Sequence, residues 1–257
     1  MLITLTTDFG LQDSFVGVMK GVIAGINSAA TVVDLTHGIP AQDVIAGALT
    51  LRHSIGYFPR GTIHVAVVDP GVGSARRPVL IECDGSYFIG PDNGVLSLAV
   101  ADKKPELIVQ LSNSAYHLQP MSMTFHGRDI FAPVAAHLSL GVPVSAFGRS
   151  LETFYRLALP KVVRSTDQIV GEIVYIDSFG NLFTNIGEHD LTGLAREQIE
   201  ISLGAIRILG LASNYAAGNF VVVVNSWGLL EIAVNRGSAR QNTGAKIGDK
   251  VKVTIAR

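Results

Sequence analysis

The stretch from residue 67 to residue 77 reads Val67-Val68-Asp69-Pro70-Gly71-Val72-Gly73-Ser74-Ala75-Arg76-Arg77. An apolar run, Thr62–Val68, leads into it and predicts a buried strand that ends at a carboxylate followed by Pro and Gly. Segments 3–10 and 32–38 have the same layout, an apolar run that ends in polar residues before Gly. Ligands of open α/β sheets bind at the carboxyl ends of the strands. The three segments therefore predict an α/β sheet with a functional site at that edge.

Outward from this stretch, predicted strands and helices alternate up to about residue 159. The helical spacing of apolar residues from Phe15 follows a helix-start signal at Asp13-Ser14. The predicted strands are 2–5, 31–35, 62–68, 78–83 and 106–111, and the predicted helices are 15–26, 42–57, 92–101 and 129–138. Such alternation is typical of an α/β domain, here residues 1–160, with a layered and mostly parallel sheet.

The pattern changes from Lys161 onward. Short β-rich runs are separated there by Gly, Asn and Ser, and they cover Ile169–Ile176, Gln198–Leu203, Ala205–Leu211, Phe220–Val224, Leu229–Val234 and Lys250–Ile255. No long helix is predicted. We expect a smaller, all-β, barrel-like domain over residues 168–257, joined to the first by residues 160–167.

Composition excludes several classes of function. The net charge is −1 and the 20 basic residues form no long run, which argues against nucleic acid and anionic membranes as partners. No apolar stretch is long enough for a membrane span and Met1 leads directly into a strand, so we expect a cytoplasmic protein. Cys83 is the only cysteine, which excludes an internal disulfide, and we expect it to be a small buried residue.

Further polar residues are candidates for a site in the first domain. His126 precedes Gly at a predicted helix start, where it is either a proton carrier and hydrogen-bond donor or a locally satisfied histidine. Arg128-Asp129 is more simply a capping ion pair. Asp8 follows the first strand and is placed to bind ribose hydroxyls, whereas Asp13 is either a binding residue or a helix cap. No glycine-rich phosphate loop follows the first strand, which favours a nucleoside without phosphates.

Two segments of the second domain mix polar and aromatic residues. In segment 175–185, Phe179 is suited to stack on a planar ring and Asn181 to bind its edge. The equal alternative is an Asx-rich hairpin with core Phe residues. Segment 225–231 contains the only Trp of the chain and leaves the same two interpretations open.

Four motifs together resemble one family. They are Thr7-Asp8-Phe9-Gly10, Val68-Asp69-Pro70-Gly71-Val72-Gly73, Phe125-His126-Gly127-Arg128-Asp129 and Phe179-Gly180-Asn181-Leu182-Phe183-Thr184-Asn185. In this order, through both domains, they resemble the SAM hydroxide adenosyltransferases, the S-adenosyl-L-methionine hydrolases related to fluorinase and chlorinase. The resemblance implies hydrolysis of S-adenosyl-L-methionine (SAM) to adenosine and L-methionine. It also implies a homotrimer whose sites lie between the first domain of one subunit and the second domain of its neighbour.

The resemblance also implies roles for individual residues. The water-handling set of the family falls on Asp69, Arg76 and His126, and the adjacent Arg77 leaves the choice of arginine open. The ribose-binding acid falls on Asp8, the methionine-end contacts on Asp13, Asp177 and Ser226, and the adenine contacts on Phe179, Asn181 and the stretch from Glu231 through Val234 to Arg236. In the halide-using relatives an aromatic residue replaces Asp69 and the histidine is also replaced, so the resemblance disfavours halide chemistry here.

The implied reaction is physically consistent with these residues. Attack at the ribose C5′ of a sulfonium expels a neutral thioether, so the leaving group needs no general acid. Arg76 and His126 as donors, with Asp69 orienting the water or accepting its proton, would favour a hydroxide-like nucleophile. An apolar pocket favours this in-line (SN2) reaction because charge is annihilated on the way to the transition state. The scheme requires neither a metal nor a cofactor.

Three alternatives remain at the level of sequence. A metal-dependent nucleoside hydrolase would use Asp8, Asp13 and Asp69 as cation ligands, but Arg76 beside the site would oppose a cation. A non-catalytic sensor of adenosine or SAM would bind through the same residues without turnover. Halide-dependent adenosyl transfer would show a dependence of the product on chloride.

Overall fold

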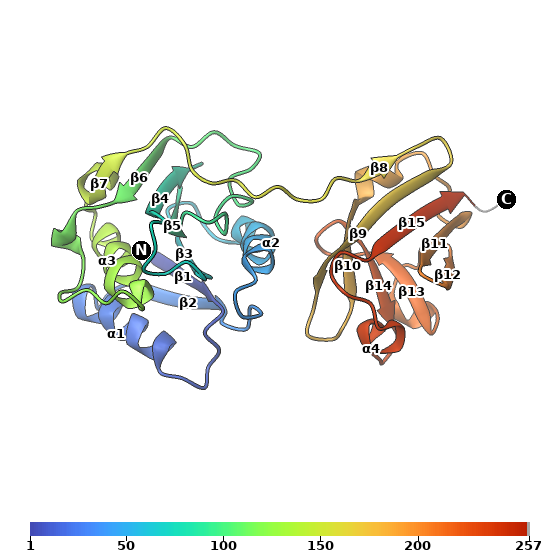
Figure 1. The fold of residues 1–257 in the computed structure, drawn as a ribbon, viewed down its shortest axis with the longest axis horizontal. Helices are drawn as coiled ribbons and strands as arrows, with labels where there is room; N and C mark the ends of the chain where they lie inside the picture. Colours follow the sequence, from blue (N-terminus) through green and yellow to red (C-terminus); the bar gives the residue numbers. More distant parts are fainter. Residues whose placement is uncertain (256–257) are drawn as a thin grey trace. The chain divides into compact units, whose positions relative to one another are not determined.

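The computed structural model describes residues 1–255, and these form two compact units (Figure 1). Unit 1 is Met1–Leu157, and unit 2 runs from Ala158 to the end of the described residues. Both units are rich in β-sheet. Within the described residues, no helix has the length and apolar character needed to cross a membrane.

Unit 1 is built on a seven-stranded mixed sheet in the order β2-β1-β3-β5-β4-β6-β7. The strands are β1 Leu2–Thr7, β2 Thr31–Thr36, β3 Ile63–Val67, β4 Pro78–Cys83, β5 Ser86–Pro91, β6 Leu107–Leu111 and β7 Gly148–Ser150. The first four strands of the order pair in parallel, but β4, β6 and β7 pair antiparallel with their neighbours. The expectation of a mostly parallel sheet is therefore corrected to a mixed sheet.

A tight turn explains the antiparallel half. Asp84 and Gly85 join β4 to β5 with φ values of 52° and 69°. Two central residues with positive φ are typical of the type I′ hairpin turn, for which Asp-Gly is a favoured pair. The two-residue connection forces β4 and β5 to be antiparallel, because a parallel connection needs a dozen or more residues. Strand β5 was not predicted, although the Asp84-Gly85 pair is a sequence signal for this hairpin.

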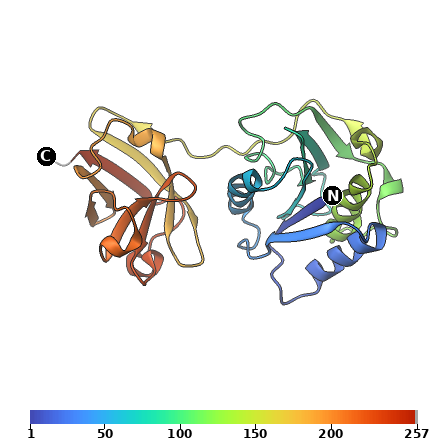
Figure 2. The ribbon, with the colours of Figure 1, turned by 180° about the vertical axis from the view of Figure 1, so that it is seen from behind.

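Helices cover both faces of this sheet. Figure 1 and Figure 2 show α1 (Phe15–Ile26) and α3 (Ala132–Ser139) on one face and α2 (Val44–Ser54) on the other. A π-helical turn, η3 (Gly127–Phe131), precedes α3, and a 3₁₀ turn, η1 (Ile55–Tyr57), follows α2. The helices predicted at 15–26, 42–57 and 129–138 thus correspond to helical segments. The remaining 3₁₀ turns within residues 1–255 are η2 Ser114–Tyr116, η4 Val144–Phe147, η5 Glu188–Leu191 and η6 Tyr215–Ala217.

The helix predicted over residues 92–101 is wrong, because this segment folds as consecutive turns. Gly94 has a φ of +103°, outside the helical range. The Asn93 side chain accepts a hydrogen bond from Val95 N at 3.1 Å and donates one to Val68 O at 2.8 Å. Local side-chain hydrogen bonds of this kind compete with helix formation, and here they attach the segment to the end of β3.

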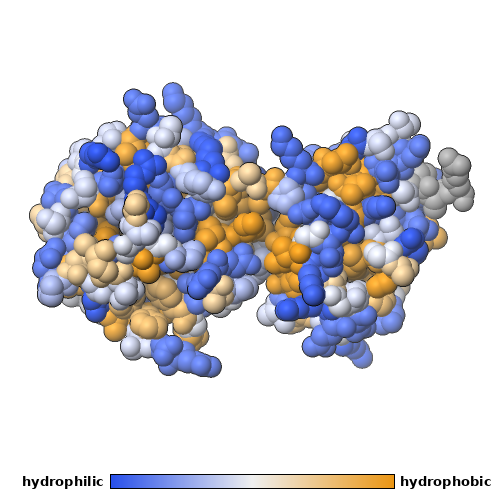
Figure 3. All heavy atoms as spheres, in the orientation of Figure 1, coloured by the Kyte–Doolittle hydropathy of each residue, from blue (hydrophilic) through white to orange (hydrophobic). Residues whose placement is uncertain are grey.

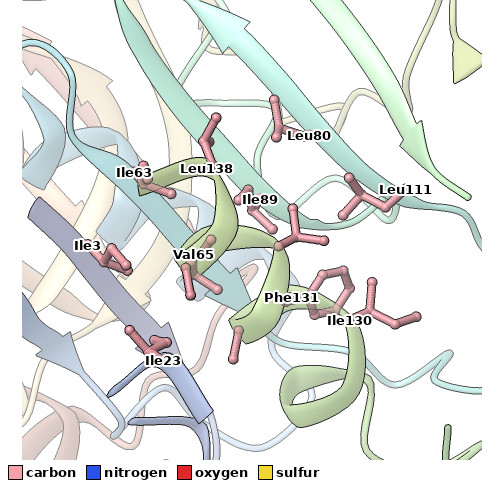
Figure 4. Close-up of a cluster of buried hydrophobic side chains, with 14 of the residues drawn as sticks. Ile3, Ile23, Ile63, Val65, Leu80, Ile89, Leu111, Ile130, Phe131 and Leu138 are labelled. Atoms are coloured by element: carbon pink, nitrogen blue, oxygen red, sulfur yellow. The ribbon is translucent and has the colours of Figure 1, made fainter. Parts of the chain in front are cut away.

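The core of unit 1 lies between the sheet and the α1/α3 layer (Figure 4). Ile3, Ile63 and Ile89 from three neighbouring parallel strands are fully buried there, together with Phe131 from η3. Full burial of each such side chain contributes about 1.5–3 kcal/mol relative to exposure. This packing fixes the carboxyl ends of β1 and β3, where the candidate residues lie. Cys83 is also buried, as predicted.

Unit 2 is an eight-stranded, wholly antiparallel sheet that nearly closes into a barrel. Its strands are β8 Val163–Arg164, β9 Gln168–Ile176, β10 Leu182–Gly187, β11 Ile199–Leu203, β12 Ile206–Leu209, β13 Phe220–Val224, β14 Leu229–Val234 and β15 Lys250–Ile255. The order is β12-β11-β15-β9-β10-β14-β13, with β8 beside β9. Ala212 N, just after β12, donates to Val222 O of β13 at 2.7 Å, which joins the two ends of the order. The barrel-like architecture is confirmed; β10 and the short helix α4 (Ala239–Thr243) were not predicted.

Candidate active site

The loop after β3 brings an aspartate and an arginine together. Arg76 Nε donates to Asp69 Oδ1 at 3.0 Å and Arg76 Nη2 donates to Asp69 Oδ2, a bidentate pair. The side chains of Arg76 and Asp69 are only 9% and 5% exposed. Gly73 makes the loop conformation possible, because its φ is +75° and a Cβ there would lie 2.3 Å from Met123 O. The two charges are thus desolvated and held in a fixed orientation.

The same arginine also holds His126. Arg76 Nη2 lies 2.7 Å from His126 Nδ1. A guanidinium has donors only, so we assign Nδ1 as the acceptor and place the imidazole proton on Nε2. Burial and the Arg76 charge lower the pKa of His126, against the opposing effect of Asp69. His126 Nε2 is buried and has no hydrogen-bond partner among the described residues. The site therefore presents one unused N–H donor of a neutral imidazole.

The neighbouring Arg77 is turned away from this cluster. Its Nε donates to Asp92 Oδ2 at 2.8 Å, and Asp92 N donates back to Arg77 O at 2.8 Å. Of the two adjacent arginines, Arg76 therefore contacts Asp69 and His126, whereas Arg77 contacts Asp92. Arg128 and Asp129 form the predicted ion pair, and Ser122 N also donates to Asp129.

Asp69 and His126 line a pocket of about 390 Å³ in unit 1. Asp8 lies in the same wall, where its Oδ2 accepts Gln42 N at 2.8 Å. Much of the rest of the lining is apolar: Phe9, Phe15, Val67, Pro70, Val72 and Phe125. The three Phe rings contact one another with centroids 5.2 to 6.0 Å apart. The lining thus combines the Asp8 and Asp69 carboxylates and the His126 imidazole with an apolar wall.

Asp13 lies outside that lining and is exposed. The N-cap residue of α1 is Ser14, which makes no side-chain cap hydrogen bond, so Asp13 is not the cap of this helix. The methionine-end role that the resemblance implies for Asp13 stays a prediction.

Unit 2 has its own pocket, of about 750 Å³. It brings together all the residues predicted in this part of the chain, namely Asp177, Phe179, Asn181, Ser226, Glu231 and Val234. Asp177 organises the loop: its Oδ1 accepts Phe179 N at 3.0 Å and Asn181 N at 2.8 Å, and its Oδ2 accepts Asn181 Nδ2 at 3.0 Å. Phe179 is 75% exposed, which leaves its ring free to stack. The Asx-rich hairpin is thus confirmed, and the binding roles of Phe179 and Asn181 stay predictions.

Several residues of this second pocket were not predicted from the sequence. Tyr215 comes from η6, and Ser238 and Gln241 come from the start of α4. Asn225 lies in segment 225–231, for which a binding role was considered, but it was not named as a candidate residue. Apolar side chains also reach the surface of both units (Figure 3), and some of them, including Phe15 and Phe179, line these two pockets. Among residues 1–255, no group of three or more His, Cys, Asp or Glu side chains is arranged to hold a metal ion.

Sequence comparison shows which family the chain is similar to. Residues 3–148 match the family model of the SAM hydroxide adenosyltransferase N-terminal domain, and residues 171–252 match that of its C-terminal domain. The chain belongs to the SAM hydroxide adenosyltransferase family. The resemblance inferred from the four motifs is therefore confirmed.

Relatives within this family are similar over nearly their whole length. An (R)-S-adenosyl-L-methionine hydrolase of Salinispora tropica is 39% identical, over 98% of this chain and 97% of the relative. One of Thermus thermophilus is 38% identical, over 96% and 97%. A fluorinase of Actinoplanes sp. is 29% identical, over 99% and 98%. A crystal structure of an uncharacterized conserved protein from Thermotoga maritima superposes with a TM-score of 0.91 at 34% identity and covers both chains completely.

Proposed function

We propose that this protein hydrolyses SAM to adenosine and L-methionine, by in-line attack of a bound water or hydroxide at the ribose C5′. The observation that carries the proposal is the buried Asp69–Arg76–His126 set, whose one unused donor, His126 Nε2, belongs to a residue that lines an apolar pocket. The hydrolase names of the 38–39% identical relatives support the same reaction.

The three residues divide the work on the nucleophile. His126 Nε2–H donates to the attacking oxygen and so favours its hydroxide form. Arg76 holds the imidazole and the carboxylate in place and keeps a positive charge beside the nucleophile. Asp69 accepts a proton or a hydrogen bond from the water through a remaining lone pair. The oxygen forms a bond to C5′, the C5′–S bond breaks with its electron pair going to sulfur, and methionine leaves as a neutral thioether.

The apolar pocket of unit 1 favours this reaction. The sulfonium and a hydroxide-like oxygen neutralise each other on the way to the transition state, so a wall of Phe9, Phe15 and Phe125 penalises the reactants more than the transition state. Holding the oxygen in line with the C5′–S bond lowers the barrier by about 7 kcal/mol in favourable cases. No step of the scheme requires a metal or a cofactor.

Substrate binding is divided between the two pockets in this proposal. Asp8 binds the ribose hydroxyls, and in unit 2 Phe179, Asn181 and Val234 bind adenine, while Asp177 and Ser226 bind the methionine end. We propose a cytoplasmic homotrimer in which each substrate-binding site is formed by the pocket of unit 1 from one protomer and the pocket of unit 2 from a neighbouring protomer. Light scattering on the purified protein tests this assembly, and a monomer with full activity would contradict it.

The deciding experiment follows the products of SAM in chloride-free buffer with a chelator, by chromatography and mass spectrometry. Both epimers at sulfur are supplied separately, because the relatives' names specify the (R) form. Adenosine plus methionine is the expected result. A product that appears only with chloride would favour halide transfer, and tight binding without turnover would favour a sensor.

A further inference from the structure

Two buried polar atoms of residues that line the pocket of unit 2 make no hydrogen bond of ordinary geometry, although the two side chains lie close to each other. They are Glu231 Oε1, a hydrogen-bond acceptor, and Asn225 Nδ2, a donor. Glu231 is only 1% exposed, and both residues line the pocket. Because the burial of an unpaired polar group is unfavourable, we expect such groups in a native pocket to bind a ligand that satisfies them.

The hairpin between β13 and β14 fixes both side chains. Glu231 pairs with Val223 across the two strands, and Asn225 N donates to Leu229 O at the start of the turn. With this alternation Asn225 and Glu231 lie diagonally on the same face of the hairpin. Asn225 Oδ1 accepts Trp227 N at 2.9 Å and Leu229 N at 3.1 Å, so the orientation of the amide is determined and Nδ2 is the atom left over.

The other carboxylate of the pocket is already engaged. Asp177 Oδ1 accepts two backbone N–H groups and Asp177 Oδ2 accepts the Asn181 amide. The Asp177 carboxylate therefore stabilises the conformation of its own loop. The buried acceptor left unused in this pocket, among the described residues, is on Glu231.

We propose, building on the proposed function, that Glu231 Oε1 binds the α-ammonium of the amino-acid end of the substrate and that Asn225 Nδ2 donates to its α-carboxylate. The assignment moves Glu231 from the adenine end, where the resemblance placed it, to the methionine end and adds Asn225. An α-amino acid carries a cationic donor and an anionic acceptor side by side, which is the complement of this pair.

Electrostatics favours a cation over the neutral edge of adenine. Burial raises the pKa of Glu231 and the Asp177 carboxylate raises it further, although the nearby Asn225 and Tyr215 side chains oppose the change. Burial and the Glu231 carboxyl raise the pKa of Tyr215 to about 12. Asp177 and Glu231 both line this pocket, so an ammonium bound there relieves the repulsion between their carboxylates, whereas adenine does not.

Two unreactive probes separate the two ends of the substrate. S-Adenosyl-L-homocysteine carries the amino-acid end without a sulfonium, and 5′-methylthioadenosine lacks that end. Calorimetric titration compares both probes on the wild type, on Glu231→Gln and on Asn225→Asp. Glu231→Gln keeps the side-chain size, and Asn225→Asp keeps the oxygen that accepts Trp227 N and Leu229 N. Thermal melting and binding of 5′-methylthioadenosine report whether each variant is folded.

We expect each variant to bind S-adenosyl-L-homocysteine at least tenfold more weakly and 5′-methylthioadenosine within twofold of the wild type. An equal loss for both probes would place Glu231 at the adenosine end and overturn the inference, as would no loss for either. If the wild type hydrolyses SAM but the variants bind the two probes with the same affinity ratio as the wild type, the inference alone fails. If the wild type binds neither probe, the inference and the proposed function fail together.

Discussion

Replacing His126 by Ala tests the proposed catalytic set most directly. The substitution removes the unused Nε2–H donor and leaves the bidentate pair of Arg76 and Asp69 intact. The Arg76 N–H that His126 Nδ1 accepts at 2.7 Å loses its partner. We therefore expect a large effect on turnover and a moderate effect on stability.

The magnitude follows from the loss of one donor. Deletion of a single donor to a developing or bound oxyanion lowers kcat about 10²–10³-fold, or about 2.7–4 kcal/mol. His126 is placed against the nucleophile and not against adenine or methionine, so we expect KM to change less than about threefold. The unpaired Arg76 N–H lowers the free energy of unfolding by about 1–3 kcal/mol.

The assay measures adenosine release by chromatography over a range of SAM concentrations. His137→Ala is the matched control, because His137 is a half-buried histidine of α3 that packs against Tyr116 and lies outside the pocket lining. We expect its kcat to stay within twofold of the wild type. Added imidazole should partly restore turnover of His126→Ala by supplying the missing N–H.

Two results would refute this reasoning. If kcat of His126→Ala is unchanged while KM rises, His126 binds substrate and does not act on the nucleophile. If His126→Ala and His137→Ala lose the same activity, the loss reflects packing of unit 1 and not a donor to water.

Three further predictions concern the loop after β3 and its partner His126. Arg76→Lys should lower kcat about 10²-fold, because an ammonium lacks the planar guanidinium that donates to Asp69 and His126 together. The control Arg77→Lys should lower kcat less than tenfold, and steady-state kinetics of both variants measures the difference. The pKa of His126 is lowered from its ordinary value of 6.5, and in the proposed mechanism the neutral imidazole is the active form. We therefore expect kcat to fall only as the pH drops through this lowered pKa. A pH–rate profile with its acid midpoint above 6.5 would contradict this prediction. Protonation also makes folding less favourable below pH 6.5, because the unfolded chain then binds more protons. Gly73→Ala should lower the free energy of unfolding by about 1–3 kcal/mol, more than Gly61→Ala, which has a positive φ but no atom within 4 Å of the added Cβ; denaturant titration of both variants checks the order.

Much of the site was predictable because its residues follow strands that local patterns predict. Asp69 comes where an apolar run ends in Pro and Gly, and Asp8 comes after the first strand. In unit 2 the predicted runs match β9 and β11 to β15, because alternating or β-branched runs bounded by Gly and Asn are a local signal. Residues 92–101 failed as a helix because side-chain hydrogen bonds of Asn93 and the positive φ of Gly94 outweigh the apolar spacing.

The sequence by itself determined the family and the two-part organisation, and it singled out Asp69, His126 and a neighbouring arginine as candidates for one cluster. It did not distinguish Arg76 from Arg77, because the distinction depends on Asp92, which the hairpin of β4 and β5 carries back to the loop. It did not reveal that Glu231 and Asn225 are left unpaired on one face of a second hairpin. Local propensity acts over a few residues, whereas the direction of a charged side chain depends on which partner, far along the chain, compensates its burial. Only the tertiary structure brings those partners together.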